Sequence, residues 1–137
     1  MNRYLVIDDE DVSRLMLSSF LSDFAPCDNA VNGKEGLQLF EKALEEGNPY
    51  TLLCIDLMMP ELNGLALIRM IRDLEKKVAV FSDFRTKIFV ITASDSAWDK
   101  ADLLLDNLCD DYIVKPFERT TLLALLEKNK LYNQSPG

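Results

Sequence analysis

Short apolar runs alternate with amphipathic segments along most of this 137-residue chain. The runs are bounded by polar, Pro or Gly residues and are typical of buried strands, while the segments between them repeat apolar residues at helical spacing. The expected strands are residues 4–7, 27–31, 51–55, 88–91 and 112–114. The expected helices are residues 11–24, a second between Gly33 and Gly47, a third after Gly64, and residues 97–107 and 118–130. Five such units predict an α/β fold, a parallel sheet with helices on both faces.

Two runs compete for the place of the fourth strand, residues 78–81 and 88–91. We choose the second because it is richer in β-branched residues and is followed directly by Thr92-Ala93-Ser94-Asp95. Residues 75–87 are then expected to extend the third helix. With this assignment we predict a flavodoxin-like (βα)5 doubly wound sheet with the strand order 2-1-3-4-5.

Apolar residues three or four positions apart define the faces of the expected helices. The first helix carries Val12, Leu15, Met16 and Phe20 at this spacing, and one side of the fourth carries Ala101, Leu104, Leu105 and Leu108. The inward residues of the other helices are expected to be Leu37, Phe40 and Leu44, then Leu67, Ile68 and Ile71, and finally Leu122, Leu125 and Leu126. We interpret Trp98, near the start of the fourth helix, as packing rather than as part of a partner-binding face.

Charge and composition argue against several classes of partner. With 15 basic and 23 acidic residues the formal net charge is −8, which disfavours direct binding to a nucleic-acid backbone. No apolar stretch reaches the roughly 18 residues needed to span a bilayer, so neither membrane insertion nor export is predicted. Cys27, Cys54 and Cys109 are odd in number and widely spaced, as expected for reduced thiols of a cytoplasmic protein. The length predicts one domain over residues 1–130, followed by a C-terminal tail over residues 131–137.

Three carboxylates follow two strands that are neighbours in the predicted sheet. Asp8 and Asp9 end the first strand and Asp56 ends the third, so the predicted order brings them to the carboxyl edge where such sheets bind ligands. Two like charges about 4 Å apart repel by roughly 4 kcal/mol at an effective dielectric of 20, so the cluster should take up protons or bind a cation. Oxygen ligands suit a hard divalent ion, above all Mg²⁺. An acidic helix start accounts for Asp11 but not for the placement of Asp56.

Two more strand ends carry groups suited to phosphoryl chemistry. Thr92 follows the fourth strand with a hydroxyl donor, and Ala93 leaves space beside it. Lys115 follows the fifth strand with a long, positively charged side chain, and Pro116 fixes the turn behind it. Either residue alone is common at a strand end. Few purely structural roles explain why a hydroxyl and an ammonium occur at strand ends together with three acids.

Four motifs at the strand ends resemble those of a known family. They are Val6-Ile7-Asp8-Asp9, Ile55-Asp56-Leu57-Met58-Met59-Pro60 with Asn63-Gly64, Ile91-Thr92-Ala93, and Asp111-Tyr112-Ile113-Val114-Lys115-Pro116-Phe117. The chain thereby resembles the CheY-like receiver domains of two-component response regulators. The resemblance implies that Asp56 is the phosphate acceptor. It also implies that Asp9 and Asp56 bind Mg²⁺ directly with the backbone carbonyl of Met58, and that Asp8 acts through water.

The resemblance assigns roles to the remaining strand ends as well. Lys115 and Thr92 are expected to contact the phosphoryl oxygens, and Tyr112 is expected to be the aromatic switch. The Lys115–Pro116 peptide bond is typically cis in this family. A sensor histidine kinase or a phosphotransfer protein is expected to donate the phosphoryl group, and a downstream effector protein to read the surface of the fourth helix, fifth strand and fifth helix. We expect a single-domain regulator that turns over no free substrate and is therefore not an enzyme.

Three alternatives remain open at this point. A phosphatase of the haloacid dehalogenase type needs a second acid two residues after its nucleophile, where Met58 stands. A flavin or nucleotide carrier on the same fold needs a Gly-rich loop after the first strand, where this chain has acids. A receiver that switches without phosphorylation is disfavoured by the complete acidic set. One departure from the family pattern is Asn107-Leu108-Cys109-Asp110 where a Gly is common, and we expect Asn107 to adopt the left-handed conformation instead.

Overall fold

The computed structural model describes residues 1–59, 63–78, 85–94 and 96–132, apart from the side chains of residues 97–99. Its sheet has the strand order β2-β1-β3-β4-β5, and all neighbouring strands are parallel. The strands are β1 (Tyr4–Ile7), β2 (Cys27–Ala30), β3 (Leu52–Ile55), β4 (Lys87–Thr92) and β5 (Asp111–Val114). The predicted flavodoxin-like (βα)5 topology is therefore confirmed.

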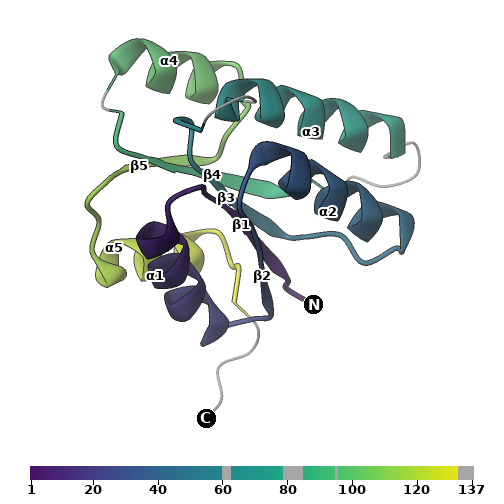
Figure 1. Ribbon diagram of the computed structural model, residues 1–137, viewed down its shortest axis with the longest axis horizontal. Coiled ribbons are helices and arrows are strands. Elements are labelled where there is room, and N and C mark those ends of the chain that lie inside the picture. Colours follow the sequence, from purple (N-terminus) through teal and green to yellow (C-terminus); the bar gives the residue numbers. More distant parts are fainter. Residues whose placement is uncertain (60–62, 79–84, 95, 133–137) are drawn as a thin grey trace.

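Helices cover both faces of the sheet (Figure 1). They are α1 (Asp11–Ser22), α2 (Gly33–Glu45), α3 (Gly64–Val78), α4 (Ala97–Leu105) and α5 (Arg119–Lys128). One face is covered by α1 and α5, and the other by α2, α3 and α4. None of the helices in the described residues combines the length and the apolar character that crossing a membrane requires.

Successive strand residues point to opposite faces, so each strand contributes to two cores. The core under α2, α3 and α4 takes Leu5, Ile7, Leu53, Ile55, Ile88 and Val90 from the strands. The core under α1 and α5 takes Tyr4, Val6, Leu52, Cys54, Phe89, Ile91 and Ile113. Leu131 is also buried in this second core, and its carbonyl accepts a hydrogen bond from the Tyr4 hydroxyl. The packed chain thus includes Leu131, while residues 133–137 lie outside the described part.

Two helices turn a different face to the sheet from the one that sequence spacing suggested. On α1 the buried residues are Ser13, Leu17 and Leu21, whereas Val12 and Leu15 are 65% and 68% exposed. Serine can occupy a buried position here because its hydroxyl donates to Glu10 Oε1 at 2.7 Å. The first helix therefore has two apolar stripes, and spacing alone does not say which one packs.

The expected apolar side of α4 was wrong at Leu104 and Leu105, although Leu108 is partly buried against the core. Leu103 is the buried leucine of this helix, while Leu104 is 40% and Leu105 83% exposed. Because α4 ends at Leu105, the chain turns back and the amides of Leu108 and Cys109 both donate to the Leu103 carbonyl. Leu103 is thus fixed against the sheet by the turn that follows it. The side chain of Trp98 lies outside the described residues.

The choice of the fourth strand was correct. Residues 87–92 form β4, and Val78, the first residue of the competing run, ends α3. Residues 79–84, which include the rest of that run, lie outside the described part. The expected extension of the third helix over residues 75–87 was wrong at its end, because residues 85–86 are not helical and Lys87 begins β4. Asn107 has a φ of 57°, so the expected left-handed turn before β5 is confirmed.

A buried ion network holds the opposite, amino-terminal edge of β4 and β5. Arg72 on α3 donates to Glu75 at 2.7 Å, to the Thr86 carbonyl at 2.8 Å and to the Leu108 carbonyl at 3.1 Å. Its guanidinium also lies 3.4 Å from Asp110, which in turn accepts the Ile88 amide at 2.8 Å. The network fastens the turn between α4 and β5 to α3, away from the strand ends that carry the acids.

Candidate functional site

The register of β1 and β3 places two acids side by side. Ile7 pairs with Ile55, so the next residue on each strand, Asp8 and Asp56, emerges at the same edge. The Asp56 amide donates to the Ile7 carbonyl at 3.2 Å, which continues the ladder to the point where the strands end. The meeting of these carboxylates is thus a consequence of strand order and register.

Asp9 completes a cluster of three acids at this edge. One carboxylate oxygen from each of Asp8, Asp9 and Asp56 lies within 4.8 Å of the other two. Asp8 is 1% and Asp56 6% exposed, whereas Asp9 is open to solvent. The donor set is all oxygen and partly accessible, so it fits a hard divalent cation that keeps some of its water. The predicted metal ligands Asp8, Asp9 and Asp56 are therefore brought together.

Lys115 lies between the two buried acids. Its Nζ is 2.9 Å from Asp8 Oδ2 and 2.9 Å from Asp56 Oδ2. The Lys115 amide donates to the Thr92 carbonyl at 2.8 Å, so the backbone pairing of β4 and β5 sets where the side chain begins. The Lys115–Pro116 bond is cis, as the resemblance implied. One ammonium group thus bridges two carboxylates from different strands.

Burial and charge act in opposite directions on these groups. Burial raises the pKa of Asp8, and the nearby Asp56 charge adds to this, although hydrogen bonds from the Glu10 amide and Lys115 oppose it. Burial lowers the pKa of Lys115, but its hydrogen bonds to Asp56 and Asp8 outweigh burial and leave that pKa raised. Lys115 therefore stays protonated, whereas the negative charge of the buried Asp8 carboxylate is only partly offset by its partners.

Backbone groups fix the direction of both buried carboxylates. Asp56 Oδ1 accepts the amide of Met58 at 2.9 Å, and Asp8 Oδ1 accepts the amide of Glu10 at 2.9 Å. The start of α3 also packs closely on this loop, because a Cβ added to Gly64 would lie 2.7 Å from the Asp56 carbonyl oxygen. Glycine at position 64 is what allows α3 to begin against the end of β3.

Thr92 and Tyr112 are linked through the loop that follows β4. Thr92 is buried, and its Oγ1 accepts the Ser94 amide at 3.4 Å. The Tyr112 hydroxyl donates to the Ser94 carbonyl at 2.9 Å, and the Lys100 ammonium lies 5.9 Å from the centroid of the Tyr112 ring. Ser94 therefore connects the two predicted switch residues. Ser94 also lines a pocket together with Leu57 and Met58, the two residues that follow Asp56.

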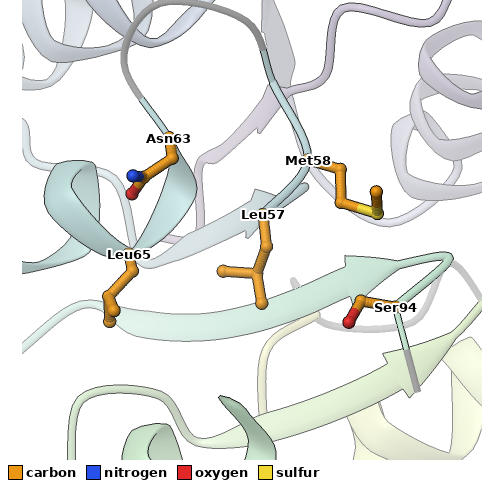
Figure 2. A pocket seen from close by; sticks show the side chains of 5 residues that line it. All are labelled: Leu57, Met58, Asn63, Leu65 and Ser94. Atoms are coloured by element: carbon orange, nitrogen blue, oxygen red, sulfur yellow. The ribbon is translucent and has the colours of Figure 1, made fainter. Parts of the chain in front are cut away.

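Two pockets flank the acidic cluster. The first, of about 290 Å³, is lined by Leu57, Met58, Asn63, Leu65 and Ser94, which come from the β3–α3 connection, the start of α3 and the β4–α4 loop (Figure 2). The second, of about 380 Å³, lies between α1 and the loop after β5 and is lined by Glu10, Val12, Ser13, Met16, Ala93, Lys115, Pro116 and Phe117. Lys115 thus reaches the cluster from the wall of an apolar groove.

Sequence reasoning missed Arg14. Its Nη1 donates to the Asp8 carbonyl at 2.8 Å, and its other terminal nitrogen pairs with Asp11. A basic residue one helical turn after an acidic run was the available signal, because residues three or four apart share a helix face. The acidic run and the polar residues at the strand ends could be recognised in the sequence. No residue spacing indicates that Arg14 contacts a backbone carbonyl.

Comparison with known sequences agrees with this geometry. Residues 4–127 match the model of the response regulator receiver domain. Response regulator ArlR of Staphylococcus saprophyticus is 38% identical over 125 residues, and ArlR of Staphylococcus epidermidis is 37% identical over the same length. Each match covers 90% of this chain and 50% of the relative, so the chain spans about half the length of these curated relatives.

Solved structures show the same architecture. The chemotaxis response regulator CheY4 of Vibrio cholerae has a TM-score of 0.74 at 26% identity, covering 93% of this chain and 98% of that one. The receiver domain of the histidine kinase CKI1 from Arabidopsis thaliana, in complex with Mg²⁺ and BeF3⁻, has a TM-score of 0.76 at 25% identity, with 93% and 90% coverage. By its matched motifs, strand order and acidic edge, the chain belongs to the response regulator receiver domain family of two-component systems.

Proposed function

We propose that Asp56 accepts a phosphoryl group from a phosphohistidine and that the modified domain presents a changed surface to an effector protein. The observation that carries this proposal is the position of Lys115, whose ammonium touches Asp56 and Asp8 at 2.9 Å each. An acid aimed by a backbone amide, beside a fixed cation and two further acids, is suited to an in-line transfer of a charged group. The donor is a sensor histidine kinase or a phosphotransfer protein, and the exchange takes place in the cytoplasm.

The transfer step uses one carboxylate oxygen of Asp56 as nucleophile. That oxygen forms a bond to phosphorus while the bond between phosphorus and the donor's imidazole nitrogen breaks. The electron pair of the broken bond stays on the imidazole nitrogen, which then takes a proton from solvent. The Met58 amide holds the second oxygen of Asp56, which keeps the carboxylate oriented during attack. The Lys115 ammonium exchanges its hydrogen bond to the Asp56 carboxylate for one to a phosphoryl oxygen.

The acidic cluster suits Mg²⁺ in this reaction. Asp8, Asp9 and Asp56, with the carbonyl of Met58, are the residues proposed to hold it, Asp8 through water. When bound, the ion supplies positive charge next to the phosphoryl oxygens. The excess of acids over Lys115 supports this proposal, because one ammonium cannot offset three carboxylates within 4.8 Å of one another.

The change in surface is proposed to start at Thr92. The Thr92 hydroxyl donates a hydrogen bond to a phosphoryl oxygen. This movement displaces the loop at Ser94, which is hydrogen-bonded to both Thr92 and Tyr112. The Tyr112 ring then reorients, and with it the surface of α4, β5 and α5. Moving a two-state equilibrium from 1:99 to 99:1 takes about 5.5 kcal/mol, and charge-assisted hydrogen bonds from Thr92 and Lys115 are of a size to supply much of this.

An apolar surface beside Lys115 supports a protein as the donor. Val12, Leu15 and Met16 are exposed on α1, and Val12 and Met16 also line the groove that contains Lys115. Exposed apolar residues next to a reactive site are typical of contacts with a protein partner. An effector protein is proposed to bind the changed surface of α4, β5 and α5.

A phosphatase of the haloacid dehalogenase type is disfavoured by the same geometry. Position 58, two residues after Asp56, is Met, and its side chain is 63% exposed beside the pocket of Figure 2. A thioether cannot protonate a leaving group as that mechanism needs. Asp56 is therefore proposed to hold its phosphoryl group long enough to signal.

The proposal is tested by intact mass after exposure to acetyl phosphate, with Mg²⁺ or with EDTA. We expect one added phosphoryl group per chain in Mg²⁺, little in EDTA, and none in Asp56→Asn. Asp28→Asn is the matched control, because Asp28 is a partly exposed acid beside Arg3 at the other edge of the sheet. An unaltered mass in Mg²⁺, or labelling that persists in Asp56→Asn, would refute the proposal.

A further inference from the structure

Arg14 contacts the backbone of the acidic cluster rather than its carboxylates. Its Nη1 donates to the Asp8 carbonyl at 2.8 Å, and the second arm of the guanidinium pairs with Asp11 on the first turn of α1. The side chain is 16% exposed, so it is packed along the start of the helix. A guanidinium is a rigid fork, and two contacts fix its plane.

The Asp8 carbonyl belongs to the peptide that joins Asp8 to Asp9. Because a peptide is planar, fixing its carbonyl also fixes the direction in which the chain enters Asp9. Asp8 itself has other supports, since its carboxylate is held by the Glu10 amide and by Lys115. Among the described residues no hydrogen bond or ion pair holds the Asp9 carboxylate, although it lies in the cluster with Asp56.

We propose that Arg14 is a positioning residue that orients the Asp8–Asp9 peptide and thereby preorganises the Asp9 carboxylate for the divalent cation. This inference rests on the proposed function, because it concerns the Mg²⁺ site named there. In this proposal the hydrogen bond from Arg14 to the Asp8 carbonyl affects cation binding more than the positive charge of Arg14 does. A positive charge near the cluster by itself repels a cation, so the two effects of Arg14 have opposite signs.

Because positioning and charge change Mg²⁺ affinity in opposite directions, the Arg14→Gln variant distinguishes between them. Loss of a group that supports a metal ligand typically weakens metal binding by about 10- to 100-fold. We expect the Mg²⁺ dissociation constant of the unphosphorylated chain, measured by isothermal titration calorimetry, to rise by about 10-fold. If Arg14 acted through charge alone, the same variant would bind Mg²⁺ more tightly. The matched control is Arg119→Gln, which removes an exposed arginine that pairs with Asp23 at the far end of α1, and we expect little change in the dissociation constant.

A second readout needs no metal. The NMR order parameter of the Asp9 amide should fall in Arg14→Gln, while that of Met58, which lies in the other loop of the site, stays as in the unsubstituted protein. Unchanged order at Asp9, or Mg²⁺ binding that is unchanged or tighter, overturns the inference. If the unsubstituted chain binds no Mg²⁺, the proposed function fails, and the order parameter still decides whether Arg14 positions Asp9. Should Arg14→Gln not fold, Arg14→Lys, which lacks the fork, is expected to change both readouts in the same direction.

Discussion

Replacing Lys115 by Met removes the ammonium group between Asp8 and Asp56 and leaves two buried carboxylates facing each other. With oxygens no more than 4.8 Å apart, their repulsion is at least about 3.5 kcal/mol at an effective dielectric of about 20. The protein can avoid this repulsion by taking up one proton. At pH 7, protonating a carboxyl group with an ordinary pKa of about 3.9 costs about 4 kcal/mol, at about 1.4 kcal/mol per pH unit. We therefore expect Lys115→Met to lower the free energy of unfolding by roughly 3–4 kcal/mol at pH 7.

The pH dependence of this loss gives the sharper test. The folded variant would hold a proton that the unfolded chain releases above its ordinary pKa, so lowering the pH favours the folded state. The raised pKa of Asp8 acts in the same direction, since its stabilising contribution is present at low pH and is lost as the pH rises through the folded pKa. The difference between the variant and the unsubstituted protein should shrink by up to about 1.4 kcal/mol per pH unit and be small near pH 4.

Urea unfolding followed by circular dichroism in EDTA, from pH 4 to pH 8, measures this difference. Lys128→Met is the matched control, because Lys128 pairs with Asp111 at 3.3 Å but is 67% exposed. Its loss should change the free energy of unfolding by at most about 1 kcal/mol at any pH in this range. A pH-independent loss in Lys115→Met, or one no larger than the control, would refute the reasoning.

Three further substitutions test the surrounding structure by urea unfolding. Gly64→Ala places a Cβ 2.7 Å from the Asp56 carbonyl oxygen and should cost about 1–3 kcal/mol; an unchanged midpoint would show that the loop relaxes freely. Tyr4→Phe leaves a buried backbone carbonyl without its donor and should cost about 1–3 kcal/mol, whereas no loss would mean that water replaces the hydroxyl. Arg72→Met removes the basic partner of the buried Glu75 and should cost about 3–5 kcal/mol, and a neutral result would contradict the importance of that network.

The fold could be predicted because its strands are local features. Apart from β2, which is Cys27-Asp28-Asn29-Ala30, each strand is a short, mainly apolar run that ends at or just before a polar residue. The fourth strand differs from its competitor by its β-branched residues. The grouping of Asp8 with Asp56 followed from strand order, since parallel strands end at the same edge. What the pattern could not supply was the choice between two apolar stripes on α1 and on α4. That choice depends on contacts with the sheet and on the turn after Leu105.

Contacts between distant residues account for most of what sequence reasoning missed. Arg72 binds the Thr86 carbonyl just before β4 and the Leu108 carbonyl in the turn before β5, and nothing in local spacing indicates a pairing over such separations. Arg14 lies close in sequence to Asp8, but it binds the Asp8 backbone carbonyl. Every residue has such a carbonyl, so the sequence does not indicate which one is bound. The roles of Asp56, Lys115 and Tyr112 remain predictions that the geometry supports.

The central claim is that Asp56 carries the phosphoryl group, and chemical mapping of the modified residue tests it most directly. Borohydride reduces an aspartyl phosphate to homoserine, which peptide mass spectrometry can locate. After treatment with acetyl phosphate and Mg²⁺, the account predicts homoserine at position 56 and unmodified aspartate at positions 8 and 9. Homoserine at another position, or none anywhere in a protein that is folded and loaded with Mg²⁺, would contradict it.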